Sequence, residues 1–167
     1  MHVFNIIKAT TDNIPDIQEI INETWEPTYR NIISPAQIEY MHHEIYQTEA
    51  LQKQMAEGQR FFILYLNEVP VGFASYSLHE GHTYKLNKLY LKPSYQGQGF
   101  GRLLIHHVEQ DAQERGGKFL ILNVNRHNNA RQIYERIGFK VIKEEDIPIG
   151  PYWMNDYVMQ KTITAEE

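Results

Sequence analysis

The stretch LYLKPSYQGQGFGRLL, residues 89–104, places three glycines within five residues, between an apolar run and a leucine-bearing segment. The apolar run predicts the end of a strand, and the stripe that starts at Leu103 predicts a helix ending at Gly116-Gly117. The first turn of a helix has unpaired N–H groups and a partial positive charge, and glycines let an anion approach them without obstruction by a Cβ atom. The stretch therefore predicts a strand–loop–helix unit whose loop binds a phosphate or pyrophosphate, with Arg102 at its rim.

Two familiar nucleotide-binding motifs fit this loop poorly. A P-loop closes with Gly-Lys-Ser/Thr, and here Arg102 and Leu103 follow Gly101. A dinucleotide-binding fold needs a parallel βαβ unit and an acidic residue about 20 positions further on. The strands before this loop predict an antiparallel meander, and GGKFLILNVN, residues 116–125, supplies no acid. A glycine turn without any ligand stays as the other interpretation.

Composition limits the class of protein. The chain has 167 residues, 42% hydrophobic and 22% charged, which is ordinary for one globular domain spanning residues 1–167. The net charge of -5 argues against a nucleic-acid partner, because nucleic-acid-binding surfaces are usually basic. Without cysteine there is no disulfide, thiol nucleophile or cysteine-ligated zinc. No signal peptide or membrane span is recognisable, so a cytoplasmic protein without a membrane partner is expected.

The hydrophobic patterns predict an α/β (α+β) fold in the order β-α-α-β-β-β-α-β-α-β-β. Helices are predicted from Ile14 to Trp25, from Pro35 to a stop at Gly58, after the glycine loop, and over 128–137. The predicted strands cover residues 3–9, 60–67, 71–79, 83–92, 118–124, 139–145 and 152–161, with an irregular join at 26–33 and a loop at 146–151. The three strands from 60 to 92 have short joins, which indicates the antiparallel meander.

Two motifs carry a family resemblance. Residues 96–101, QGQGFG, match the Q/R-x-x-G-x-G/A signature of the GNAT superfamily of N-acetyltransferases, in its usual place between a strand and a helix. Residues 128–139, NNARQIYERIGF, resemble the family's N-x-x-A-x-x-x-Y-x-x-x-G-F helix. The resemblance covers nearly the whole chain and is weakest over 10–60. There, residues 23–55 resemble the first helices of bacterial polyamine (spermidine/spermine) N-acetyltransferases.

The resemblance implies a GNAT fold with a mixed central sheet of about seven strands, and acetyl-CoA as co-substrate. The pantetheine arm would pair with the strand at 89–91, which in the family splays from the next strand, and the pyrophosphate would lie on the loop amides. The implied cofactor-binding residues are Leu89, Tyr90, Leu91, Gln96, Gly97, Gln98, Gly99, Phe100, Gly101, Arg102 and Asn128. His127 occupies the slot of the family asparagine, so Asn128 and Asn125 are alternatives for that role.

Tyr134 matches the family tyrosine near the thioester sulfur, so the resemblance implies that it protonates the departing thiolate. A phenol stays protonated at neutral pH, as an acid must; simple core packing is the alternative. The usual positions of a general base hold no carboxylate, since those strands offer lysine and asparagine instead. His79, Glu80 and His82 in the turn before residue 83, or a water chain, are the remaining candidates, and solvated turn residues are the simpler interpretation.

The resemblance implies that the acceptor pocket lies between the first helices and the last loop, where Trp25, Tyr29 and Tyr152 are candidates. Because no cysteine can carry an acyl group, a primary amine is expected to attack the thioester directly in a ternary complex. A polyamine or other small amine is the favoured acceptor, and a protein N-terminus or lysine is the alternative. No metal is expected, and a homodimer stays open. The rival functions are an acyl-CoA-binding sensor without catalysis and a nucleotide-binding protein.

Overall fold

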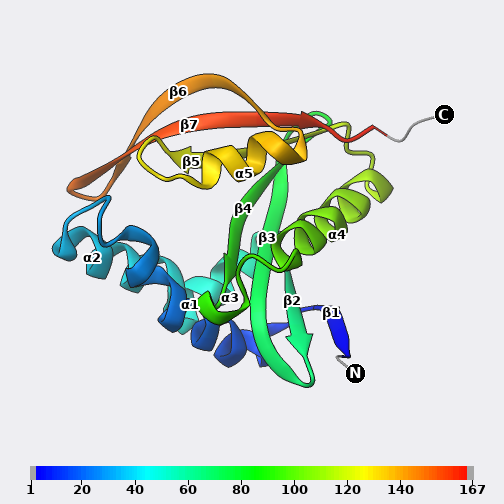
Figure 1. Cartoon of the computed structure of the whole chain (residues 1–167), viewed down its shortest axis with the longest axis horizontal. Helices are drawn as coiled ribbons and strands as arrows, with labels where there is room; N and C mark the ends of the chain where they lie inside the picture. The colour runs from blue at the N-terminus through cyan, green and yellow to red at the C-terminus, as the bar shows by residue number, and fades with distance from the viewer. Residues whose placement is uncertain (1–2, 165–167) are drawn as a thin grey trace.

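The computed structural model describes residues 3–164, which form one seven-stranded sheet with helices on both faces (Figure 1). The strands are β1 (Phe4–Lys8), β2 (Arg60–Leu66), β3 (Val69–Glu80), β4 (Thr83–Leu91), β5 (Phe119–Asn125), β6 (Lys140–Ile149) and β7 (Tyr152–Thr162). The helices are α1 (Ile14–Tyr29), α2 (Pro35–Tyr46), α3 (Thr48–Ala56), α4 (Phe100–Glu114) and α5 (Ala130–Ile137), with short 3-10 turns η1 (Thr11–Asn13) and η2 (Pro93–Tyr95). Within the described chain, no helix is both long enough and apolar enough to cross a membrane.

The strand order in the sheet is β1-β2-β3-β4-β5-β7-β6. All neighbours are antiparallel except β4 and β5, which run parallel with α4 as the crossover. The predicted mixed sheet of seven strands and the predicted meander are therefore confirmed.

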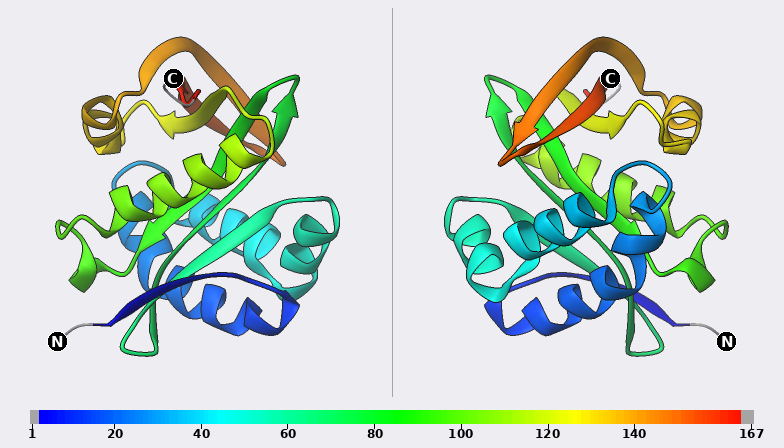
Figure 2. Two further views of the ribbon diagram at one scale, coloured as in Figure 1. Left: turned by 90° about the vertical axis from the view of Figure 1, so that its right-hand side faces the viewer. Right: turned by 90° about the vertical axis from the view of Figure 1, so that its left-hand side faces the viewer.

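Helices cover the two faces unequally. Figure 2 shows α1 to α3 on one side of the sheet, and α4 and α5 on the other. The isoleucines of α1 are buried in the core on their side, together with Trp25, and the stripe of α4 is buried in the core on the opposite side. The apolar spacing that predicted each helix is thus the spacing that faces the sheet.

The second predicted helix, Pro35 to Gly58, is divided into α2 and α3, so that prediction was wrong at its centre. Gln47 has an extended backbone with φ -64° and ψ 154°. The side-chain amide of Gln18 on α1 donates to the Tyr46 carbonyl oxygen and to the Thr48 hydroxyl, both at 3.1 Å. A tertiary contact with α1 thus satisfies the polar groups at the break, and local sequence does not reveal this contact.

Two predicted irregular segments are partly regular. Helix α1 continues through Pro27 to Tyr29, where an irregular join was predicted. The hydroxyl of Thr28 donates to the Thr24 carbonyl oxygen at 2.6 Å within this last turn. The predicted loop at 146–151 is also wrong over its first four residues, because β6 pairs with β7 as far as Ile149 opposite Tyr152.

The tip of the β6–β7 hairpin packs against α2 (Figure 1). The amide of Gln37 on α2 donates to the Trp153 carbonyl oxygen at 2.8 Å. Gly150 has a φ of +55°, and a Cβ atom there would lie 2.1 Å from the Tyr40 hydroxyl oxygen. A glycine is therefore required twice over at this turn, by its backbone and by the neighbouring ring. These two contacts hold the hairpin tip against α2.

Candidate active site

The sheet opens between its two parallel strands. Strands β4 and β5 pair over four residues each, Thr83–Leu86 with Phe119–Leu122, and beyond these residues no pairing joins the two strands. Strand β4 still pairs with β3 on its other edge as far as Leu91. Over residues 87–91 it therefore presents backbone N–H and C=O groups along one free edge, to which an extended amide-bearing ligand can pair.

A β-bulge in β4 sets which side chains face the opening. The register with β3 shifts between Ser75 and Tyr76, so that Asn87 is the extra residue. After the shift, Leu89 and Leu91 pack in the core beneath α4, while Tyr90 packs in the core beneath α1. The free edge thus separates an apolar side from a side with phenol hydroxyl groups.

The glycine loop follows directly from this edge. Gly97 and Gly99 have φ values of +77° and +87°, a backbone that glycine adopts without strain. Within residues 3–164, none of the six consecutive amides from Gly97 to Arg102 donates to a protein acceptor. Gly101 is helical, and a Cβ atom there would make an ordinary 3.5 Å contact with Leu91.

These free amides stand at the N-terminus of α4, which carries no acidic residue in its first turn and no side-chain cap. Such an arrangement suits an anion, because the amides and the helix dipole both favour negative charge. A pocket of about 480 Å³ adjoins the loop between α4, α5 and β7. Gly99, Arg102 and His106 line it, and Lys161 closes its far side in an ion pair with Glu109. The donor set fits a pyrophosphate group.

Tyr134 lies on α5, half-buried in the α4-side core, with its ring edge-on to Phe139 at 5.9 Å between centroids. Burial first, and then the nearby Tyr29, raise the pKa of the Tyr134 hydroxyl above its usual range. Tyr29 belongs to the opposite core, beneath α1. Tyr134 and Tyr29 therefore belong to opposite cores, yet Tyr29 lies near enough to contribute to the raised pKa of Tyr134.

On the α1 side, three phenols gather around the free edge. The hydroxyl groups of Tyr29 and Tyr90 lie 3.2 Å apart, and the Tyr46 ring is edge-on to Tyr90 at 6.4 Å between centroids. Burial raises the pKa of all three hydroxyl groups, so each stays protonated at neutral pH. Sequence reasoning singled out Tyr29 and the strand position of Tyr90, and it missed Tyr46.

The other two predicted acceptor residues lie elsewhere in this arrangement. Trp25 is only 3% exposed, and its indole N–H donates to the Ile38 carbonyl oxygen at 2.9 Å, so it joins α1 to α2. Tyr152 lies at the hairpin tip with its ring 5.5 Å from that of Tyr40. The structure therefore brings Tyr29 to the opening and places Trp25 and Tyr152 in packing contacts around it.

The predicted asparagines shape the turn between β5 and α5. Asn128 accepts from the Ala130 N–H at 2.9 Å and so organises the start of α5. Asn125 is 6% exposed and accepts from the His127 N–H at 2.9 Å. Asn128 is half-buried, while His127 is exposed. The Asn128 side chain is thus engaged with its own turn, as is that of Asn125.

The turn residues considered as a general base do not reach the opening. His79, Glu80 and His82 are exposed at the β3–β4 turn, where β4 begins beside β5. At roughly 3.3 Å per strand residue, His82 lies about 20 Å from Leu89. The structure contradicts a direct role for these residues and favours the solvated-turn interpretation.

Two buried ionisable side chains that sequence reasoning did not single out lie on the α1-side face. Lys88 on β4 is 8% exposed and Asp156 on β7 is 5% exposed. Burial lowers the pKa of the Lys88 ammonium to about 7 and raises that of the Asp156 carboxyl. The alternation of β7 does place Asp156 with Met154, but only the strand order shows that this face borders the opening.

Comparison with known proteins adds to this geometry. The model of the acetyltransferase (GNAT) domain family matches residues 29–153. A spermidine N(1)-acetyltransferase of Thermoplasma acidophilum is 26% identical over 162 residues, covering 93% of this chain and 95% of that protein. The crystal structure of the PaiA N-acetyltransferase from the same organism, in complex with coenzyme A, has a TM-score of 0.83 at 26% identity, covering 96% of this chain and 99% of that chain.

Other relatives match over a shorter range. An uncharacterized N-acetyltransferase of Mycobacterium tuberculosis is 34% identical over 94 residues, covering 56% of this chain and 60% of that relative. A ribosomal protein bS18-alanine N-acetyltransferase of Haemophilus influenzae is 37% identical over 90 residues, covering 52% of this chain and 60% of that relative. With its splayed parallel strands, its glycine loop and a family model that matches three quarters of its residues, the chain belongs to the GNAT family of acetyltransferases.

Proposed function

We propose that this protein transfers an acetyl group from acetyl-CoA to a primary amine. The observation that carries the proposal is the free edge of β4 at residues 87–91, which leads directly into six unpaired loop amides. One ligand that is an extended chain of amides with a pyrophosphate at its end satisfies both features. The likeness to a structure that contains coenzyme A supports the same ligand.

Acetyl-CoA supplies an acetyl group activated as a thioester. In the proposed site the amides of 97–102 bind the pyrophosphate, with Arg102 and the Gln96 and Gln98 side chains beside them. The edge at Leu89, Tyr90 and Leu91 pairs with the pantetheine arm, and an N–H near Leu89 stabilises negative charge on the carbonyl oxygen. Tyr134, held protonated by burial, donates a proton to the leaving thiolate. Asn128 organises the turn beside the cofactor.

For the acceptor, we propose a small amine of the polyamine class that enters from the α1 side, past Tyr29. The relative named as a spermidine acetyltransferase matches over nearly the full length of both chains, including the first helices. A protein N-terminus is the second candidate, because the relative named for ribosomal protein bS18 alanine is more similar over about half of this chain. Trp25 and Tyr152 support the walls of this space through packing.

An amine panel tests the proposal. Release of free coenzyme A is measured from acetyl-CoA with spermidine, spermine, amino acids, and peptides that begin with alanine. Turnover that is fastest with the polyamines supports the proposal, and fastest turnover with a peptide supports the second candidate. Tight binding of acetyl-CoA without turnover on any amine identifies a sensor, and preference for ATP or NAD over coenzyme A contradicts the cofactor.

A further inference from the structure

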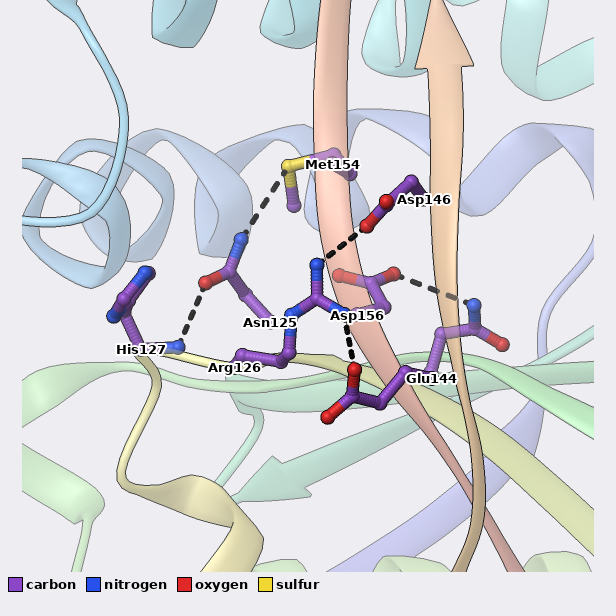
Figure 3. A network of polar contacts seen from close by, with 8 residues as sticks. Asn125, Arg126, His127, Glu144, Asp146, Met154 and Asp156 are labelled. Atoms are coloured by element: carbon purple, nitrogen blue, oxygen red, sulfur yellow. Dashed lines mark hydrogen bonds and ion pairs between the residues drawn. The ribbon is translucent and has the colours of Figure 1, made fainter.

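Asp156 has a carboxylate oxygen without a partner. The side chain projects from β7 and is 5% exposed. Its Oδ2 atom accepts from the Asn123 side-chain amide at 3.3 Å, while its Oδ1 atom is buried and has no hydrogen-bond partner within residues 3–164. Figure 3 shows the carboxylate beside the turn of Asn125 and Arg126. A buried oxygen of a charged group without a hydrogen bond is unfavourable by several kcal/mol, so this one is suited to a ligand that donates.

The carboxylate lies where the sheet has opened. Asp156 is opposite Asn125 on β5, three residues beyond Leu122, the last residue of β5 that pairs with β4. Side chains alternate along a strand, so Asp156 faces the same side as Met154, which is buried in the α1-side core. This is the side from which the proposed amine enters.

Charged and titratable groups from four other segments surround the carboxylate. They are Tyr29 on α1, Lys85 on β4, Glu145 on β6 and Arg126 in the β5–α5 turn, and each interacts with it electrostatically. None of them hydrogen-bonds or ion-pairs with Asp156. Arg126 is engaged with Glu144 and Asp146 instead.

We propose that Asp156 is a catalytic residue that accepts a proton from the substrate ammonium at its Oδ1 atom, with Asn123 positioning the carboxylate. This assignment rests on the proposed acetyl transfer. It places a carboxylate on β7 beside Asn123 of β5, a strand that itself offers only asparagine. Strand β4 offers no carboxylate on this face either, because its residues there are Lys88 and Tyr90.

The proton balance is complete. The ammonium loses one proton to Asp156, and the free amine attacks the carbonyl carbon of the thioester. The carbon–sulfur bond then breaks, and the thiolate takes a proton from Tyr134. The nitrogen of the new amide still carries one surplus proton, which returns to the Tyr134 oxygen and restores the phenol. Asp156 then releases its proton to water, so one proton is released per acetyl group transferred. Burial raises the pKa of the carboxyl group, which brings it closer to the range of an effective base.

The first test replaces Asp156→Asn, which keeps the shape and removes the charge. With spermidine as the acceptor, kcat is expected to fall about 100-fold or more while the dissociation constant for coenzyme A is unchanged. The matched control is Asp146→Asn on the neighbouring strand, an exposed acid whose loss removes the same charge and is expected to leave kcat unchanged.

The second test leaves Asp156 in place. The hydrogen bond from Asn123 lowers the pKa of Asp156, so Asn123→Ala is expected to raise that pKa. Because the base must be ionised, the acidic limb of the kcat profile should move to higher pH in Asn123→Ala. A purely structural contact between β5 and β7 predicts lower stability with no such movement, and this profile decides the question if Asp156→Asn does not fold.

The outcomes separate the two proposals. Asp156→Asn that binds coenzyme A and retains kcat within a factor of about three overturns the assignment and leaves the proposed transfer intact. A raised KM at unchanged kcat also overturns it, because the carboxylate then only binds the amine. A wild-type protein that acetylates no amine in the panel overturns the proposed function, and the assignment with it.

Discussion

Lys88 is a lysine that the fold has removed from water without providing a carboxylate. Its Nζ atom donates to the Gln59 side-chain oxygen at 2.9 Å and lies 5.4 Å from the centre of the Phe61 ring and 5.9 Å from that of Tyr46. Burial, and then repulsion from Lys85, lower its pKa from 10.5 to about 7. Keeping the buried ammonium protonated therefore lowers the stability of the folded protein.

This shift gives Lys88 its own contribution to the pH dependence of stability. Between about pH 7 and 10 the unfolded chain binds a proton at Lys88 that the folded protein does not, so stability rises with pH, by up to about 1.4 kcal/mol per unit. Replacing Lys88→Met should raise the free energy of unfolding at pH 6 and remove this rise. Urea denaturation across this pH range measures it, with the exposed Lys53→Met as a control that should keep the rise. An unchanged slope in Lys88→Met would contradict the prediction.

The Tyr134 hydroxyl can be removed with little change in packing. Because its raised pKa keeps the phenol protonated, Tyr134→Phe should lower kcat about tenfold or more and leave the dissociation constant for coenzyme A unchanged. Tyr157→Phe on β7 is the matched control, a half-buried phenol in the same core whose loss should leave kcat unchanged. Equal kcat in Tyr134→Phe and wild type would rule out the acid role.

At the scale of elements, the glycine loop and the start of α4 form the binding unit. Gly99 has a φ of +87°, and a Cβ atom there would meet no protein atom within 4 Å, so its methyl group would project into the space beside the free amides. The strain of a left-handed alanine is about 1 kcal/mol, wherever it occurs. Any further effect of a Gly99 substitution must come from the ligand.

Gly116 provides the control, since its φ is +88° and its surroundings are equally open, at the other end of α4. Gly99→Ala should weaken coenzyme A binding about tenfold or more, because the amides bind the anion at close range. Gly116→Ala should lower the free energy of unfolding by about as much as Gly99→Ala does, and leave coenzyme A binding unchanged. Calorimetric titration and thermal unfolding measure the two effects. Equal affinity in both variants would remove the loop from the binding site.

At the scale of the whole molecule, the sheet consists of two parts joined by a short parallel contact. Strands β1 to β4 form one part and β5 to β7 the other, and only Thr83–Leu86 and Phe119–Leu122 pair between them. A ligand paired to the free edge completes the hydrogen bonding of β4, and its stabilisation of the folded state increases with the logarithm of its concentration above the dissociation constant.

Hydrogen exchange should report this ligand directly. Saturating coenzyme A is expected to slow exchange at the amides of 97–102, which lack acceptors in the protein, and at those amides of 87–91 that point away from β3. The β1–β2 pair, at the far edge of the sheet, should change little. If β1–β2 slows as much as the loop does, the ligand acts through overall stability and not through the free edge.

Much of this architecture follows from local patterns. The spacing of Ile14, Ile17 and Ile20 predicted α1, and the short joins after residue 60 predicted the meander. The predicted ends of elements were less accurate. The break at Gln47 depends on Gln18, and the turn at Gly150 packs against the Tyr40 ring, so both depend on residues far away in the chain. The pairing of Ile149 with Tyr152 is local to the hairpin, but the proline-containing sequence of 146–151 does not show it.

The sequence by itself determined the family and the strand–loop–helix unit with its glycine loop, because these depend on residues that are near neighbours in the chain. Only the tertiary structure decided which side chains meet at the opening. Tyr29, Tyr134 and Asp156 come from three elements and from opposite faces of the sheet. Tyr29 lies within electrostatic range of both other groups, at the place where β5 leaves β4 after four residue pairs while β7 continues along β5. The carboxylate that we propose as the base therefore comes from β7, a strand next to the expected ones, and local sequence carries no signal for that proximity.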